Sequence, residues 1–142
     1  MSGAPELVIR RVIAVPREEV FDAWLDPGTL ARIMLPGTTT AATAQVDARV
    51  GGRFQIVMMH GVERFVHRGE YLVIDRPSRL SFTWISKVTD NRQSIVTIEF
   101  HDRGGSTELI LTHRDLPPAN VDKHRAGWGG ILEKLDIALR TP

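Results

Sequence analysis

The side chains of this sequence that could carry out chemistry are few. The chain of 142 residues has 5 histidines, 1 tyrosine and no cysteine. The lack of cysteine excludes disulfides, a thiol nucleophile and every cysteine-based zinc or iron–sulfur site. A histidine beside a tyrosine can transfer protons as a general acid–base pair. The candidates for such a pair are His67, Tyr71, His113 and His124. Because no motif singles out a pair among them, we predict no catalytic residue, and the pattern favours a binding protein over an enzyme.

A metal site is the second chemistry that histidines suggest, because imidazole is a common zinc ligand. The histidines that could take part are His60, His67, His113 and His124. They fall on three expected strands and one expected helix, so their spacing gives no support. Neither a His-x-His nor a His-x-x-x-His pair occurs among them. We therefore predict no metal and no cofactor.

The composition is that of a soluble globular protein. Apolar residues make up 42% of the chain and charged residues 25%, and 18 basic against 17 acidic residues give a net charge of +1. No long run of one charge sign occurs, so we expect no nucleic-acid partner. Residues 1–10 do not resemble a signal peptide, and no apolar run approaches the roughly 20 residues that cross a bilayer. We predict one domain over residues 1–142, located in the cytoplasm and not inserted in a membrane.

Turn residues and hydrophobic periodicity divide the chain into the elements that must position these side chains. The strands that we expect are 7–15, 40–48, 53–60, 63–75, 79–86, 94–101 and 107–114. Two short helices, 16–25 and 29–34, follow the first strand, separated by Asp26-Pro27-Gly28. The later strands have no helices between them, so they favour an antiparallel meander. A long helix over 117–139 ends the chain.

The long helix carries one apolar stripe at three- and four-residue spacing. The stripe consists of Val121, His124, Trp128, Ile131, Leu132, Leu135 and Leu139. Gly127, Gly129 and Gly130 each weaken helix propensity by roughly 1 kcal/mol relative to alanine. Such a cluster predicts either a close approach of another segment to the helix backbone or a bend.

Alternation along the strands predicts which side chains face inward, because successive side chains point to opposite faces of a sheet. Charged residues mark the outer face, so the side chains between them face inward. This assigns to the inner face Phe54, Ile56, Met58, His60, Phe65, His67, Gly69, Tyr71, Val73, Leu80, Phe82, Trp84, Val96, Ile98, Phe100, Leu109, Leu111 and His113. Val57 and Met59 would then form an outward apolar pair, which leaves a homodimer contact open.

A mostly apolar concavity with a few converging polar groups is typical of a ligand pocket. We predict its lining to be Phe54, Ile56, Met58, His67, Tyr71, Phe82, Trp84, Ile98, Phe100, Leu111, His113, His124, Trp128 and Leu132. The competing interpretation is purely structural: Trp128 is then a core residue, and His124 is a buried polar group that has its hydrogen bonds.

An ordered set of short motifs runs through nearly the whole chain. The motifs are Ile9-Arg10-Arg11, Pro16-x-x-x-Val20-Phe21-x-Ala23-Trp24, Gly51-Gly52-Arg53-Phe54, Arg68-Gly69-x-Tyr71, Pro77-x-x-Arg79-Leu80-x-Phe82-x-Trp84, Thr107-x-Leu109-x-Leu111-x-His113 and His124-x-x-Gly127-Trp128-x-x-x-Leu132-x-x-Leu135. In this order and spacing the chain resembles the bacterial proteins similar to the C-terminal domain of the Hsp90 ATPase activator. This AHSA1-like family lies in the START-like (SRPBCC, polyketide cyclase-like) superfamily.

The resemblance implies an α+β helix-grip fold, with a curved antiparallel sheet of about seven strands around a long C-terminal helix. It also implies a cavity between sheet and helix that binds a hydrophobic small molecule such as a lipid, sterol or polyketide. Two alternatives stay open. One is a protein-interaction module with an Hsp90-type chaperone as partner, although a copy without the activator's preceding domain need not contact Hsp90. The other is a cyclase- or hydrolase-like enzyme.

Overall fold

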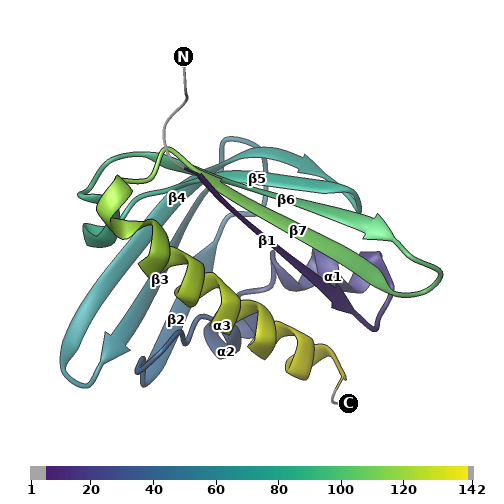
Figure 1. The fold of residues 1–142 in the computed structure, drawn as a ribbon, viewed down its shortest axis with the longest axis horizontal. Coiled ribbons are helices and arrows are strands. Elements are labelled where there is room, and N and C mark those ends of the chain that lie inside the picture. The colour runs from purple at the N-terminus through teal and green to yellow at the C-terminus, as the bar shows by residue number, and fades with distance from the viewer. Residues whose placement is uncertain (1–5, 141–142) are drawn as a thin grey trace.

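The computed structural model describes residues 6–140. The elements, in chain order, are β1 (Glu6–Ile13), α1 (Arg17–Ala23), α2 (Pro27–Ile33), β2 (Ala41–Val46), β3 (Arg53–His60), β4 (Glu63–Asp75), β5 (Arg79–Trp84), the short 3-10 helix η1 (Lys87–Thr89), β6 (Ser94–Asp102), β7 (Thr107–Arg114), the 3-10 turn η2 (Pro118–Asn120) and α3 (Val121–Arg140). Figure 1 shows α3 crossing in front of the sheet. Within residues 6–140, no helix has the combination of length and apolar character that spanning a membrane requires.

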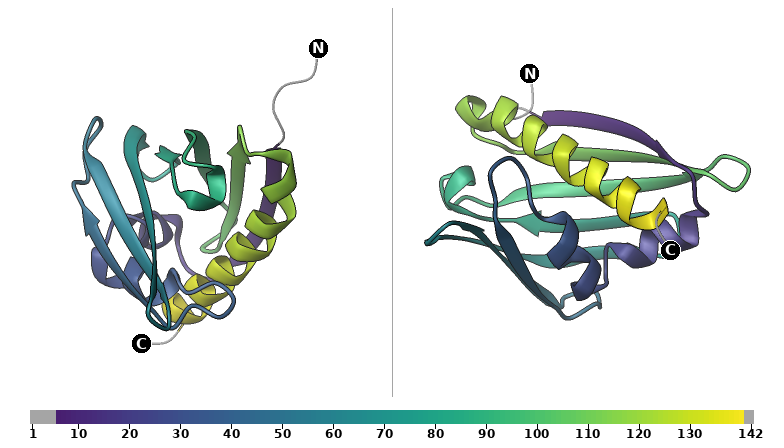
Figure 2. Two further views of the ribbon diagram at one scale, coloured as in Figure 1. Left: turned by 90° about the vertical axis from the view of Figure 1, so that its left-hand side faces the viewer. Right: turned by 90° about the horizontal axis from the view of Figure 1, so that it is seen from below.

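The strands form one 7-stranded sheet in the order β1-β7-β6-β5-β4-β3-β2. Every neighbouring pair is antiparallel, so β2 to β7 form a meander and β1 closes its far edge beside β7. Figure 2 shows the sheet curving from β2 and β3 round to β7 and β1, with α3 against its concave side. This arrangement confirms the predicted α+β helix-grip fold.

The two short helices after β1 are confirmed, but the second helix begins earlier than predicted. Asp26-Pro27-Gly28, expected to separate the helices, instead starts α2. The Asp26 carboxylate accepts hydrogen bonds from the backbone N–H and the hydroxyl of Thr29, at 2.9 and 2.6 Å. An aspartate at the N-cap followed by a proline at the first helical position is a favourable start for a helix.

The predicted stripe of α3 packs into the core through its C-terminal half. The buried residues of α3 are the stripe members Trp128, Ile131, Leu132 and Leu135, together with Asp136, which was not assigned to the stripe. Asp136 is ion-paired with Arg11 of β1 at 3.0 Å and with Arg140 at 3.1 Å. These pairs join the end of the helix to the edge strand β1.

Glycines in α3 let the segment after α2 approach the helix backbone, which is the first of the two alternatives that the glycine cluster predicted. A Cβ atom on Gly127 or Gly130 would lie 3.8 or 4.0 Å from Pro36, in the segment after α2. A Cβ on Gly129 would have no atom within 4 Å outside its own helix and chain neighbours. Gly129 therefore has no packing reason to be glycine.

The inward face predicted from alternation holds for β3, β5, β6 and β7, whose assigned aromatic and aliphatic side chains are buried. It is wrong for Val73. The pairing of β4 with β5 shifts between Tyr71 and Val73, so Val73 pairs with Ser81 and Ile74 pairs with the core residue Leu80. Such a β-bulge adds one residue and reverses the alternation beyond it. Ile74 takes the inward position that was assigned to Val73.

Two positions on β3 and β4 show how closely the sheet is packed. Gly69 on β4 faces the core, and a Cβ there would overlap the Thr83 carbonyl and the Phe54 ring. On the other face, Val57 points away from the core cluster as predicted, yet it is only 8% exposed beside its strand partners Thr43 and Val66. The proposed role of Val57 and Met59 in a homodimer contact stays a prediction.

Candidate functional site

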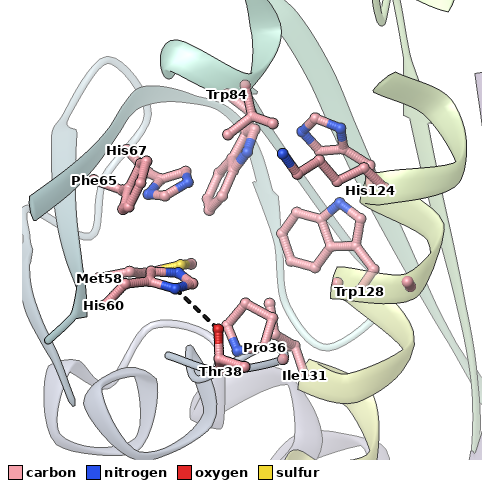
Figure 3. Close-up of a pocket in the computed structure, with 15 residues that line it drawn as sticks. Pro36, Thr38, Met58, His60, Phe65, His67, Trp84, His124, Trp128 and Ile131 are labelled. Carbon is pink, nitrogen blue, oxygen red and sulfur yellow. Dashed lines mark hydrogen bonds between the residues drawn. The ribbon is translucent and has the colours of Figure 1, made fainter. Parts of the chain in front are cut away.

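A cavity of about 450 Å³ lies between α3, the strands β3 to β5 and the segment that follows α2. Figure 3 shows its walls, with Trp84 and Trp128 on one side and Met58 and Phe65 on the other. The lining residues are Pro36, Gly37, Thr38, Met58, His60, Phe65, His67, Trp84, Val88, Lys123, His124, Ala126, Gly127, Trp128 and Ile131. Most of this wall is apolar, and its volume falls within the range of small-molecule sites.

The predicted lining residues are distributed over three places. The cavity wall contains Met58, His67, Trp84, His124 and Trp128. A separate void of about 10 Å³ deeper in the core is bordered by Phe54, Ile56, Tyr71 and Phe82. Among residues 6–140, neither of these two spaces is bordered by Ile98, Phe100, Leu111, His113 or Leu132, which are buried in the core. Alternation identifies the inner face but not the part of that face which packing leaves open.

Several wall residues were missed because they lie outside the strand alternation and the helix stripe. The segment Pro36, Gly37 and Thr38 closes one side of the cavity, and Val88 and Lys123 lie at its border. The glycines of α3 were the one signal that another segment approaches here. A turn sequence such as Pro36-Gly37 does not indicate which surface it contacts.

His113 is the centre of a buried hydrogen-bond chain. Trp128 Nε1 donates to His113 Nδ1 at 2.9 Å, so the ring proton lies on Nε2, which donates to Ser94 Oγ at 2.7 Å. Ser94 Oγ donates in turn to the Trp84 carbonyl at 2.6 Å. Burial, and then the nearby His124, lowers the pKa of His113 to about 3. His113 is thus neutral; it holds the Trp128 ring directly and is joined through Ser94 to the backbone of Trp84.

His67 contributes a buried nitrogen to the site. The residue is 5% exposed, and its Nδ1 has no hydrogen-bond partner among the described residues. Its ring lies 5.0 Å from the Trp84 ring, and Figure 3 shows it pointing into the cavity. Burial lowers the pKa of His67 to about 4, more than the nearby Phe65 carbonyl raises it. His67 is therefore neutral at pH 7.

His124 lies on the other side of Trp84, on the first turns of α3. Its Nδ1 is 2.9 Å from the Asn120 carbonyl, so Nδ1 carries the proton and donates. Nε2 of the neutral ring is then an acceptor. Burial lowers the pKa of His124, against the effect of the Asn120 carbonyl, and the positive charge of Lys123 lowers it further.

His60 joins the wall segment after α2 to the end of β3. Its two ring nitrogens lie 3.2 Å from the Thr38 hydroxyl and 3.1 Å from the Thr39 hydroxyl. Alternation placed His60 on the inner face, and it does line the cavity at an exposed position. Its contacts with Thr38 and Thr39 position the segment that closes this side.

The four residues considered for acid–base chemistry do not meet in one place. Tyr71 borders the deeper void, where burial raises its pKa, and both ring nitrogens of His113 are engaged. Only His67 and His124 line the cavity. In the described part of the chain, no three His, Asp or Glu side chains are grouped closely enough to hold a metal ion.

Comparisons with known proteins agree with this fold. A crystal structure of a protein from Chromobacterium violaceum matches with a TM-score of 0.85 and 25% identity, over 96% of this chain and 97% of that one. An Hsp90 activator from Plasmodium falciparum matches with a TM-score of 0.77 and 27% identity, over 96% and 97%. A protein from Arthrobacter aurescens, 18% identical over 98% and 88% of the two chains, shares the fold with a TM-score of 0.84. No curated protein matches the sequence. The family described as activator of Hsp90 ATPase homolog 1-like protein matches residues 14–140, and this chain belongs to that family.

Proposed function

We propose that the protein binds a hydrophobic small molecule in the cavity beside α3. The observation that carries this proposal is the pair of indole rings, Trp84 and Trp128, which lie 5.0 Å apart and form one wall of a 450 Å³ space. The Trp128 ring is held by its hydrogen bond to His113, and Ser94 joins His113 to the backbone carbonyl of Trp84, so the wall is formed before any ligand arrives. A preformed apolar wall binds without the entropic cost of ordering its side chains. We also propose that the protein acts as one domain in the cytoplasm.

Binding of the neutral fluorescent dye N-phenyl-1-naphthylamine tests the proposal. Dye bound against the wall formed by Trp84 and Trp128 is expected to quench tryptophan emission and to accept energy from it. Gly127→Leu places a side chain at the cavity wall, and we expect it to weaken dye binding by about tenfold or more. Gly129→Ala is the matched control, since Gly129 lies on the same helix and a Cβ there has open space. Equal dye affinity in the wild type and in Gly127→Leu would contradict the proposal.

A second candidate function is stimulation of an Hsp90-type chaperone. The observation that favours it is the 27% identity, over nearly the whole of both chains, to a protein described as an Hsp90 activator. The ATPase rate of a purified bacterial Hsp90, measured with and without this protein, tests it. An unchanged rate, together with no binding by sedimentation, would exclude this role for that chaperone.

A further inference from the structure

The titratable side chains of the cavity wall are all of the same chemical type. The titratable side chains that line the cavity are His60, His67, Lys123 and His124. All of them are basic, and within residues 6–140 no Asp or Glu lines the cavity. The cavity therefore combines an apolar body with a basic end at Lys123 and His124, which are neighbours on α3.

The basic groups lie close enough to affect one another without any acidic partner at the wall. His60 and His124 both disfavour the charged form of His67, and Lys123 disfavours that of His124. His113 of β7, whose ring centroid is 5.1 Å from that of His124, is neutral and engaged on both nitrogens. An anion placed beside Lys123 and His124 would raise the pKa of His124, because an opposite charge favours the protonated imidazole.

The two groups at this end require different things of a ligand. His124 donates through Nδ1 to Asn120, which leaves Nε2 as an acceptor in the neutral ring. Lys123 carries a positive charge, and no acidic side chain is among the described lining residues. A ligand that brings both negative charge and a proton therefore satisfies this end better than a neutral molecule.

We propose that the ligand is an apolar monocarboxylic acid, bound with its carboxyl group at His124 beside Lys123 and with its apolar body against Trp84, Trp128 and Met58. This inference rests on the proposed binding function and specifies its ligand class. Because Nε2 of His124 has no proton in the neutral ring, a carboxylate needs one proton to form a hydrogen bond there. That proton arrives either on the ligand or on the imidazole. Binding is therefore coupled to the uptake of about one proton per ligand anion.

Isothermal titration with 2-naphthoic acid and its neutral counterpart 2-naphthamide tests the ligand class. We expect the acid to bind about tenfold or more tightly than the amide at pH 6.5, and its affinity to fall as the pH rises to 8.5. Repeating the titration in buffers with different ionisation enthalpies measures proton uptake directly. The amide is expected to bind without proton uptake.

Variants locate the carboxyl group. His124→Gln and Lys123→Met should each weaken binding of the acid by about fivefold to tenfold and leave the amide unaffected. Lys123 is exposed, so Lys123→Met keeps the fold, and His124→Gln should in addition abolish proton uptake. Lys134→Met, on the same helix but outside the cavity wall, is the matched control and should bind both compounds like the wild type.

The possible outcomes separate this inference from the function on which it rests. If the amide and N-phenyl-1-naphthylamine bind as tightly as the acid, or if the acid binds without proton uptake, the basic end does not select a carboxylic acid. The binding function would then stand without this inference. If neither naphthalene compound nor the dye binds, the proposed function is wrong and this inference fails with it.

Discussion

Lowering the pH from 7.5 to 5 should destabilise this protein through its buried histidines. His113 and His67 are 0% and 5% exposed, and burial lowers their pKa values to about 3 and about 4. In the unfolded chain both return to the ordinary value near 6.5. Below that pH the unfolded chain takes up protons that the native state does not bind. Stability is thus fully present above pH 6.5 and is lost as the pH falls toward the native pKa values.

The size of the loss follows from the two pKa values. Each pH unit between the native and unfolded pKa costs roughly 1.4 kcal/mol per histidine, so at pH 5 each residue costs about 2 kcal/mol. His67 and His113 together therefore cost about 4 kcal/mol, and His124, whose pKa is also lowered, adds to the loss in the same direction. Small proteins have total stabilities of about 5–15 kcal/mol, so this is a large fraction. Carboxyl groups titrate mostly below pH 5 and contribute little in this range.

Urea unfolding followed by tryptophan fluorescence, at several pH values from 7.5 to 5, measures this loss. His113→Gln removes one of the two groups, so the variant should start less stable at pH 7.5 but lose about 2 kcal/mol less than the wild type on acidification. The difference between the two pH values is read within each protein, which separates titration from the packing effect of the substitution. A wild-type stability that is equal at pH 7.5 and 5, or a variant with the full wild-type loss, would refute a buried neutral His113.

Four further substitutions have expected effects on the free energy of unfolding, each measured by urea denaturation. Gly129→Ala should raise the free energy of unfolding by about 1 kcal/mol, because the added methyl group meets open space and alanine favours the helix. Gly69→Ala should lower the free energy of unfolding by about 1–3 kcal/mol, because the added Cβ overlaps the Thr83 carbonyl. A stabilising Gly69→Ala would contradict the packing described for β4. Trp128→Phe should cost about 1–3 kcal/mol by leaving His113 Nδ1 without its donor, and a neutral result would show that the buried chain contributes nothing. Asp136→Asn should cost about 1 kcal/mol at low salt and less at 1 M salt, since it weakens the ion pairs with Arg11 and Arg140; a loss independent of salt would point to packing instead.

The pattern of apolar and polar residues predicted much of the fold, because strands and helices are determined mainly by residues close together in the sequence. Side-chain alternation in β5, β6 and β7 depends only on the two-residue period of a strand, and the stripe of α3 depends only on the helical period. The exceptions have identifiable causes. The bulge after Tyr71 breaks the period of β4, and Asp26 begins a helix where the dipeptide Pro27-Gly28 reads as a break.

The candidate site was predictable only in part, because a cavity is the space that packing leaves unfilled. Phe82 and Trp84 face the same side of β5, yet only Trp84 reaches the cavity wall. His113 and His124 both entered the predicted lining, but the hydrogen bonds from Trp128 and to Ser94 occupy His113 completely. Whether the predicted lining residues contact a ligand stays a proposal.

The sequence by itself determined the strands, the gripping helix, the family and the inward set of aromatic and histidine side chains, since these depend on residue type and period. Only the tertiary structure decided which of those side chains share a space and that Pro36 closes it against the glycines of α3. It also decided that the titratable side chains among the described lining residues are all basic. These properties depend on contacts between segments far apart in the chain, such as Trp84 with Trp128 and Thr38 with His60. No local period encodes those distances, and the curvature of the sheet sets them.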